Sequence, residues 1–250
     1  MQQRYFSQVY WHFTGSPDGI NWSTIKSPEQ ILEHGKPKDD KRATDIALKV
    51  LDSQTLMATC VEQIASNLTT ETFCCVTDVP VKDLNYHGQY YGHVAIGFRA
   101  SAVQSNFLPV LYIPRDRLPD VNEVTEPDGQ LTAIASELLS STGGWGQAQG
   151  DKLMRQAYIR GMTRVVANTE RMQGLFPNML KITNFSPGLG GSFYSEREWR
   201  HFGDFQFGSE DVEAVLVPEA ELPMVLAKLQ QSPYQGCKVN VLSWEFLGRA

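Results

Sequence analysis

The fold is decided by the apolar stretch His93-Val94-Ala95-Ile96-Gly97-Phe98. This stretch is apolar enough to be a central strand of a sheet, and the run Pro109-Val110-Leu111-Tyr112-Ile113 has the same character. A short helical excursion is expected between the two runs. Both runs are therefore predicted to be central strands of one sheet.

Other strands and helices are predicted on both sides of this stretch. Strands rich in β-branched and aromatic residues and bounded by turns are predicted over residues 9–14, 72–77, 193–201, 205–207, 212–217 and 239–246. Helices are predicted around Ala47, over 82–91 and over 219–230, and helical patterns dominate the middle of the chain. Strands at both ends of a helical middle predict an α+β fold.

The length of the chain favours a single domain, because 250 residues are enough to bury one large core. The stretch 115–129 is rich in Asp, Glu and Pro and marks a boundary before the helical middle. We therefore expect one α+β domain over 1–250. In this domain a split mixed or antiparallel sheet surrounds a cleft, and a helical insertion occupies about 129–183.

Charge and hydropathy limit the classes of partner. The formal net charge is −6, from 22 basic and 28 acidic residues mixed along the chain. Such a chain lacks the basic patch with which proteins follow a phosphate backbone, so nucleic-acid binding is unsupported. No stretch approaches the roughly 20 uninterrupted apolar residues of a membrane span, and the first residues lack the pattern of a secretory signal. We expect a cytoplasmic protein that does not insert into a membrane.

The four cysteines are Cys60, Cys74, Cys75 and Cys237. Their spacing matches neither a zinc site nor a dense disulfide framework, so buried thiols are expected. Cys74 and Cys75 are neighbours in a predicted strand, and successive strand residues face opposite sides of the sheet. One of these two thiols is therefore expected to pack inward, while the other has a different environment.

Motifs that define the commonest enzyme classes are absent. The sequence has no Walker loop, no G-x-G-x-x-G, no G-x-S-x-G and no H-E-x-x-H. The set of Asp78 with His87 or His93 has the spacing of no common metal site, so no metal is expected. Candidate chemistry therefore rests on three groups: residues 12–14, the polar aromatic group within 87–93, and the run 194–200.

The run Tyr194-Ser195-Glu196-Arg197-Glu198-Trp199-Arg200 is predicted to be part of a strand. Its period of two places Tyr194, Glu196, Glu198 and Arg200 on one face. If this face lines a cleft, mutual repulsion and desolvation raise the pKa of one carboxyl group while Arg200 opposes the shift, as in many active sites. The alternative is an exposed charge ladder near a sheet edge, which is favoured where no cleft is present.

His12 stands near the end of the first predicted strand. A histidine in an aromatic strand is most often a core residue that donates a ring N–H to a neighbouring carbonyl group. The alternative follows from position, because the strand ends at Thr14 and donors at a strand end can hold a ribose or a phosphate. For Tyr90 and Tyr91 the alternatives are packing at a helix end and stacking on a ligand.

Several of these segments together resemble the AbiGi family of bacterial abortive-infection proteins. The matching segments follow one another in the order 10–14, 73–80, 87–92, 95–98 and 194–200. This resemblance implies a role in bacterial phage defence, in a family that is labelled as an antitoxin component. A cognate toxin, antitoxin or sensor protein would then be the partner.

A more distant similarity is to ADP-ribosyltransferase-like proteins, whose NAD cleft uses a strand-borne His, an aromatic residue that stacks on nicotinamide and a late-strand Glu. His12, Tyr91 and Glu198 follow that order. The similarity implies that NAD is the substrate and that Glu198 stabilises the positive charge that develops on the ribose. It also implies that Glu196 orients or deprotonates an acceptor group. The residues that would bind NAD are His12, Thr14, Tyr91 and Arg200.

Two functions therefore remain open. An ADP-ribosyltransferase-like effector would cleave NAD and transfer ADP-ribose to a macromolecule. A non-catalytic antitoxin or sensor would instead bind a partner protein, and its carboxylates would be salt-bridge partners, as Glu198 and Arg200 could be. Release of nicotinamide from NAD in the presence of a bacterial lysate would distinguish the two functions.

Overall fold

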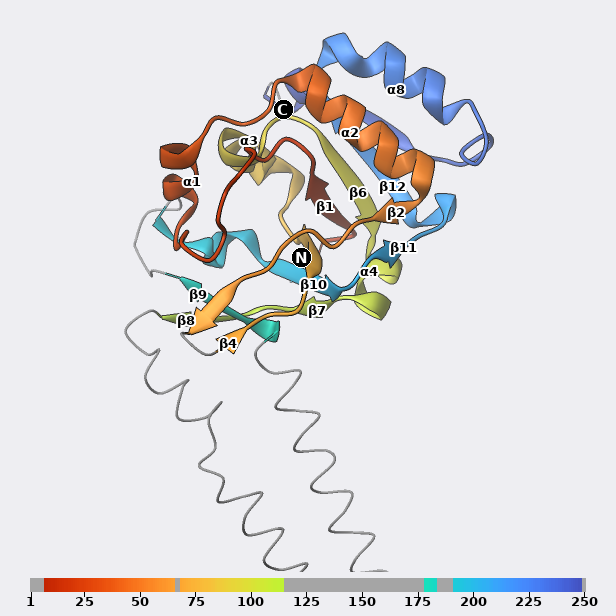
Figure 1. Ribbon diagram of the computed structural model, residues 1–250. Coiled ribbons are helices and arrows are strands. Elements are labelled where there is room, and N and C mark those ends of the chain that lie inside the picture. The colour runs from red at the N-terminus through yellow and green to blue at the C-terminus, as the bar shows by residue number, and fades with distance from the viewer. Residues whose placement is uncertain (1–6, 66–67, 115–177, 184–190, 249–250) are drawn as a thin grey trace, which may run out of the picture.

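The computed structural model describes residues 7–65, 68–114, 178–183 and 191–248 (Figure 1). The helices are α1 (Pro28–His34), α2 (Asp40–Ser53), α3 (Leu84–Tyr91), α4 (Ala100–Asn106), α8 (Leu222–Leu229) and α9 (Trp244–Leu247). The strands are β1 (Val9–Phe13), β2 (Thr55–Leu56), β3 (Gln63–Ala65), β4 (Leu68–Thr69), β5 (Phe73–Thr77), β6 (Ala95–Arg99), β7 (Leu108–Pro109), β8 (Leu111–Pro114), β9 (Leu180–Thr183), β10 (Glu198–Phe202), β11 (Phe205–Gln206), β12 (Val212–Val217) and β13 (Asn240–Ser243). Short 3-10 helices are η1 (Val81–Asp83), η5 (Phe193–Glu196), η6 (Ser209–Asp211) and η7 (Glu219–Glu221). The predicted α+β fold is confirmed.

Seven strands form the main sheet, in the order β13-β12-β6-β1-β5-β10-β7. The sheet is mixed, because β12 and β13 are parallel while the other neighbouring pairs are antiparallel. The stretch that decides the fold forms β6, and Ala95, Ile96 and Phe98 on this strand are fully buried. A strand that is apolar on both faces must be covered on both sides, which explains its place inside the sheet.

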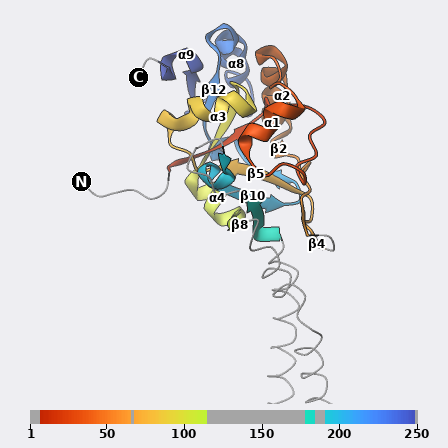
Figure 2. The same cartoon turned by 90° about the vertical axis from the view of Figure 1, so that its left-hand side faces the viewer.

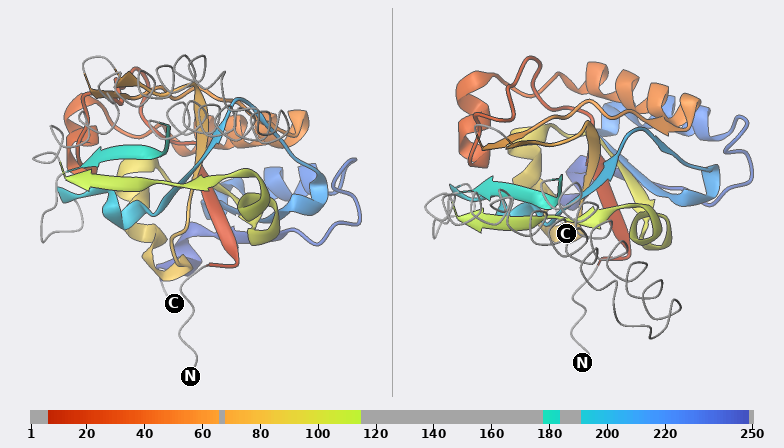
Figure 3. Two further views of the ribbon diagram at one scale, coloured as in Figure 1. Left: turned by 90° about the horizontal axis from the view of Figure 1, so that it is seen from below. Right: turned by 60° about the horizontal axis from the view of Figure 1, so that its bottom comes forward.

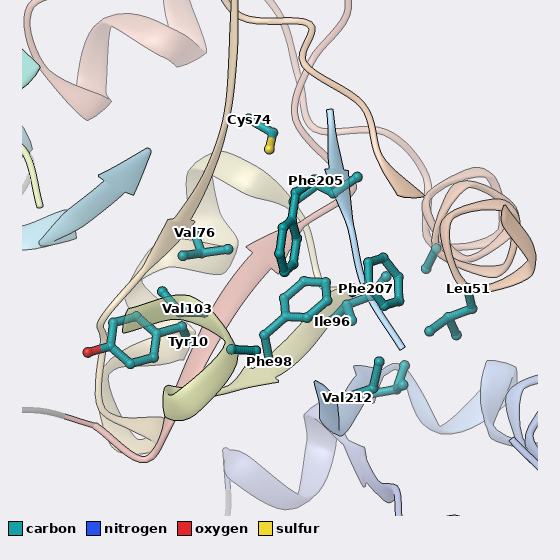
Figure 4. Close-up of a cluster of buried hydrophobic side chains, with 14 of the residues drawn as sticks. Tyr10, Leu51, Cys74, Val76, Ile96, Phe98, Val103, Phe205, Phe207 and Val212 are labelled. Carbon is teal, nitrogen blue, oxygen red and sulfur yellow. The ribbon is translucent and has the colours of Figure 1, made fainter. Parts of the chain in front are cut away.

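Each face of the sheet has its own core. On the first face α2 packs Ala47 and Leu51 against Tyr10 and Ile96 of the central strands. Figure 4 shows the aromatic part of this core, where Phe98 lies among other buried rings. The helix α8 lies beside α2 over the same core (Figure 1).

The second face is covered by α3 and α9. Leu84 of α3 and Trp244 and Leu247 of α9 pack against Trp11 and Leu216 of the sheet. The helix α1 lies beside α3 (Figure 2). The presence of a core on each face explains why β1 has large side chains at successive positions. Tyr10 and Trp11 point into different cores, because successive strand residues face opposite sides of the sheet. Within the described ranges no helix is long and apolar enough to cross a membrane.

The pairing between β1 and β5 is short, and this positions the candidate site. Only Trp11 and Thr77 are in register between these strands, whereas β1 pairs with β6 over five residues. Beyond that pair the carbonyl oxygen of Cys75 has the Nδ1 atom of His12 as its neighbour, at 2.9 Å. A side-chain contact therefore takes the place of the next backbone hydrogen bond between the two strands. The sheet therefore opens between the end of β1 and the start of β5.

One predicted central strand is wrong. The run 109–113 is divided between β7, which is an edge strand of the main sheet, and β8, which pairs in parallel with β9 in a separate two-stranded sheet. Pro109 supplies the physical reason, because proline has no N–H to donate and is confined to strand edges and ends. Figure 3 shows β8 and β9 side by side.

Two other predicted strands are partly helical. Residues Phe193–Glu196 form η5, Arg197 has a left-handed conformation with φ of 48°, and β10 begins only at Glu198. The end of the predicted strand 239–246 is the short helix α9, whose first turn is capped by the side chain of Ser243. Over so few residues an apolar pattern does not distinguish a strand from a helical turn.

A helical insertion was predicted over about 129–183, and its part up to residue 177 lies outside the described residues. Its last residues, Leu180–Thr183, form the strand β9. The other predicted elements agree with the structure: β1, β5, β6 and β12 are strands, and α2, α3 and α8 are helices. The predicted helix stop at Gly92 is confirmed, because this residue ends α3 with a φ of 81° that favours glycine.

Candidate functional site

A cavity of about 310 Å³ lies where β1 and β5 separate. Its aromatic wall includes Phe13, Trp22 and Tyr91, and its charged wall includes Glu196 and Glu198. The volume is at the lower end of the range of roughly 300–1,000 Å³ that is usual for small-ligand sites. The cavity therefore has the size and the mixed lining of a binding site.

Two buried cations organise the charged wall. Nζ of Lys181 lies 2.7 Å from Glu198 Oε2, 3.2 Å from Glu62 Oε1 and 3.9 Å from Glu196 Oε2. The guanidinium group of Arg200 is 2.7 Å from both Glu198 Oε1 and Glu62 Oε2, and it also donates to the carbonyl oxygen of Leu180 at 3.1 Å. We call these three carboxylates and two cations the buried charge network: Glu62, Lys181, Glu196, Glu198 and Arg200.

Glu198 is held ionised inside this network. Burial raises the pKa of its carboxyl group, but Arg200 and Lys181 outweigh that effect and bring the pKa down to about 2. Each of its two oxygens lies 2.7 Å from one of these cations. Because a buried charge without a partner is very costly, the three side chains depend on one another.

Glu196, in contrast to Glu198, has a raised pKa. Burial and the neighbouring charge of Glu198 raise the pKa of its carboxyl group, and although Lys181 opposes them the pKa is raised to about 7. The hydroxyl group of Tyr91 donates a hydrogen bond to Glu196 Oε1 and favours the ionised form. A carboxyl group with a pKa near neutrality is able to take up and release a proton at physiological pH.

Stacked rings form the aromatic wall. Tyr91 stacks on Trp22 with centroids 6.4 Å apart and on His87 with centroids 6.1 Å apart. His87 is only 3% exposed, and burial lowers its pKa to about 4, so that it is neutral at physiological pH. The nearby backbone of Asp83 raises the pKa of His87 and so partly opposes the effect of burial. Neither ring nitrogen of His87 has a hydrogen-bond partner of good geometry.

His12 and Thr14 line the cavity, and each has a side-chain atom that is already hydrogen-bonded to a backbone carbonyl group. His12 Nδ1 bonds the carbonyl oxygen of Cys75, and burial lowers its pKa, so the ring is neutral. Thr14 Oγ1 donates to the carbonyl oxygen of Ala43 at 2.8 Å. The arrangement of His12 is the one expected of a core histidine that bonds a neighbouring carbonyl group.

His12 and Glu198 reach this cavity from opposite faces of the sheet. His12 pairs with Ile96, which belongs to the core under α2, whereas Glu198 pairs with Thr77, which is in turn paired with Trp11 of the other core. Both side chains line the cavity because the strands between them have separated.

The predicted site residues are brought together with two exceptions. The predicted site residues that line the cavity are His12, Thr14, Tyr91, Glu196 and Glu198. Arg200 is 1% exposed and binds Glu198 without being among the cavity-lining residues. Tyr194, which was placed on the same face, is 61% exposed, because residues 193–196 form a 3-10 helix instead of a strand. The alternative of an exposed charge ladder is also wrong, since Glu196, Glu198 and Arg200 are buried.

Sequence reasoning missed two members of the charge network, and it did not place Cys60 at the cavity. Lys181 lies between Leu180 and Ile182, and a lone lysine in a short apolar run could have indicated a buried cation. Glu62 and Cys60 line the cavity from a loop, where no pattern marks them. Within the described part of the chain no three His, Cys, Asp or Glu side chains form a possible metal site.

Comparison with known proteins places the chain in a family. The family model "Putative abortive phage resistance protein AbiGi, antitoxin" matches residues 53–222, which is more than half of the chain. The chain belongs to the AbiGi family. No curated protein and no solved structure matches it. The part that matches AbiGi contains the whole buried charge network and Tyr91, whereas His12 and Thr14 precede it. The predicted resemblance to AbiGi is confirmed, and no comparison supports the similarity to ADP-ribosyltransferases.

Proposed function

We propose that this AbiGi protein is the antitoxin component of a bacterial phage-resistance system and that it acts by binding and neutralising a partner protein. The description of the family supports this role. Within the site, the observation that carries the proposal is the state of Glu198, whose two oxygens each lie 2.7 Å from a buried cation, one on Arg200 and one on Lys181.

This arrangement suits a framework better than a catalyst. A carboxylate accelerates a reaction when it stabilises charge that is larger in the transition state than in the bound substrate. The charge of Glu198 is already balanced by two cations, so little of it is left for a developing oxocarbenium ion. The network instead ties β9 and β10 to the loop that carries Glu62.

Co-expression tests the antitoxin role. The product of each neighbouring gene is expressed in a bacterial host alone, with the wild-type chain, and with a Glu198→Gln chain whose folding is verified by circular dichroism. We expect one of these products to arrest growth, the wild-type chain to restore growth and copurify with it, and the variant to retain neutralising activity. Growth arrest by the wild-type chain itself, relieved by Glu198→Gln, would instead identify an effector.

A second candidate function is ADP-ribosyl transfer from NAD. The observation that favours it is that His12, Tyr91 and Glu198 line one cavity. In this reading Tyr91 stacks on nicotinamide, Glu198 faces the ribose and Glu196 accepts the proton of an acceptor group. His12 and Thr14 hold NAD, while Arg200 acts only through its ion pair with Glu198.

Incubation of the pure protein with NAD and bacterial lysate tests this second function through the release of nicotinamide. If the protein is a transferase, Glu198→Gln abolishes turnover while the protein remains folded, and the exposed control Glu33→Gln leaves turnover unchanged. Turnover that persists in a folded Glu198→Gln protein rejects the assignment of this residue. The absence of any released nicotinamide supports the antitoxin role.

A further inference from the structure

Two cysteines lie side by side on the wall of the cavity. Cys60 forms an isolated antiparallel bridge with Phe73, with N–H···O distances of 3.1 and 2.9 Å. Cys75 is two positions further along β5, so its side chain is on the same face as that of Phe73. Bridge partners share a face as well, which brings Cys60 and Cys75 together as diagonal neighbours, and both line the cavity.

The two thiols differ from the other cysteines in their surroundings. Cys60 and Cys75 are half-buried, whereas Cys74 is buried in the core under α2 and Cys237 is exposed elsewhere on the molecule. The side-chain interaction between Cys60 and Cys75 lowers the pKa of Cys60, against the opposing effect of burial, and raises the pKa of Cys75.

The contact assigns different roles to the two sulfurs. A thiolate is the nucleophile in thiol chemistry, and a thiol with a lowered pKa reaches the thiolate form more easily. Lys181 contributes in the same direction at Cys60, although Glu198 and Glu62 oppose it. Cys60 also stands on the irregular segment 57–62, whereas Cys75 is fixed in strand β5. Cys60 is therefore the sulfur that reacts first, and Cys75 is the sulfur placed to resolve the product.

We propose that Cys60 and Cys75 form an oxidation site on the cavity wall, where a peroxide-class oxidant joins the two sulfurs in a reversible disulfide. The Cys60 thiolate attacks the peroxide, so that an S–O bond forms, the O–O bond breaks and hydroxide leaves. Cys75 then gives its proton to this hydroxide and attacks the Cys60 sulfur, so that the S–S bond forms and the S–O bond breaks. The second hydroxide, which leaves from Cys60, takes up the proton that Cys60 released when it became a thiolate. In sum, two thiols and hydrogen peroxide give one disulfide and two molecules of water.

This bond requires a shift of the local backbone. Diagonal neighbours on an antiparallel pair are farther apart than directly opposed residues, so a disulfide between them needs some backbone adjustment. Cys60 lies in the irregular segment 57–62, where only the bridge to Phe73 holds the backbone to β5. Its other backbone hydrogen bonds join Ala58 to Asp204 and Glu62 to Thr70, so it lacks the continuous ladder that fixes the central strands.

Oxidation would act on the charge network through Glu62. This residue follows Cys60 by two positions and lies 2.7 Å from Arg200 and 3.2 Å from Lys181. A bond that draws Cys60 toward β5 pulls on the same loop and changes the shape of the cavity wall. The proposed site is independent of toxin neutralisation, so each can fail without the other.

Peptide mapping of the full chain after treatment with hydrogen peroxide tests the proposal. The wild-type chain is expected to give a disulfide-linked peptide that contains Cys60 and Cys75 and is released by dithiothreitol. The Cys75→Ser variant is expected to accumulate a sulfenic acid on Cys60, which dimedone traps. The matched control is Cys237→Ser, which removes an exposed thiol and is expected to leave the 60–75 disulfide unchanged.

Three results would overturn the proposal. The first is a treated wild-type chain in which Cys60 and Cys75 remain free thiols. The second is pairing of either residue with Cys74 or Cys237 instead. The third is a Cys60 sulfenic acid that accumulates equally in the wild-type chain and in Cys75→Ser, which would show that Cys75 does not resolve it. Cys75→Ala, verified by circular dichroism, replaces the serine variant if that variant does not fold.

Discussion

Tyr91 donates a hydrogen bond from its hydroxyl group to Oε1 of Glu196, and this bond joins the end of α3 to the 3-10 helix before β10. The ring of Tyr91 belongs to the aromatic wall of the cavity, and the carboxyl group of Glu196 belongs to the buried charge network. The two walls of the cavity are therefore coupled through one contact. The protonation of Glu196 should affect both of them.

The titration of Glu196 predicts a specific dependence of stability on pH. Its pKa is about 7 in the folded chain and near the ordinary value of 4.5 in the unfolded chain. Between these values the folded chain binds more protons, so this group lowers the free energy of unfolding as the pH rises. Glu196→Gln removes the titration, and the unfolding free energy of the variant minus that of the wild type should increase from about pH 5 to about pH 8, by at most about 1.4 kcal/mol per pH unit.

Urea unfolding of both proteins across this range checks the prediction. Other titrating groups cancel in the difference between variant and wild type, provided that they are not coupled to Glu196. Glu198 provides a contrast, because its pKa is lowered to about 2 and its contribution to stability is lost as the pH falls from 4.5 toward 2. Stability curves for wild type and Glu196→Gln that stay parallel between pH 5 and pH 8 would contradict the raised pKa.

Removal of the buried cation Arg200 should be strongly destabilising. Arg200→Ala leaves Glu198 and Glu62 without a cation that lies 2.7 Å from each of them. Breaking one partner out of a buried ion pair typically costs about 3–5 kcal/mol. Arg99→Ala is the matched control, because Arg99 pairs with Glu213 at 2.9 Å while its side chain is 42% exposed, and such pairs contribute about 0–1 kcal/mol. Equal losses of unfolding free energy in the two variants would refute the role of the network.

Gly15 should not tolerate a side chain, because the chain passes very close to the end of α3 there. A Cβ atom on Gly15 would lie 2.7 Å from the carbonyl oxygen of Tyr91 and 3.0 Å from the Cα atom of Gly92. Overpacking of this kind costs about 1–3 kcal/mol, so Gly15→Ala should lower the unfolding free energy by that amount.

The control for this variant is Gly248→Ala, whose Cβ atom would lie at an ordinary 3.7 Å from the carbonyl oxygen of Glu245. We expect a change within about 0.5 kcal/mol for it. Since Gly15 contacts the backbone of Tyr91, Gly15→Ala should also weaken the bond between Tyr91 and Glu196 and shift the pH dependence described above. Thermal or urea unfolding that shows no difference between the two alanine variants would mean that the close approach is not present.

The strands of the sheet could be predicted where local sequence is enough to specify them. The strands β1, β5, β6 and β12 are apolar or aromatic, are bounded by turn residues and are buried on both sides, so their pattern is strong. The division of 109–113 between two sheets could not be predicted from its apolar pattern, because it depends on the partner β9, which is distant in sequence.

The candidate site was predictable only in part, for the same reason. Glu196 and Glu198 were singled out because a strand period of two would place both carboxylates on one face. The structure brings both to the cavity, although Glu196 lies in a 3-10 helix and not in a strand. Their cation Lys181 comes from β9, and Glu62 comes from a loop, so only the tertiary structure places them together. The conformation of Arg197, with a φ of 48°, is also what allows Glu196 to reach the network from outside β10.

The most direct test of the antitoxin role is a growth measurement on cells that express the partner toxin with or without this chain. We predict that the wild-type chain restores growth, forms a stable complex with the toxin, and does both equally well when Glu198 is replaced by Gln in a folded protein. Toxicity of the chain on its own, together with NAD consumption that Glu198→Gln abolishes, would contradict this account.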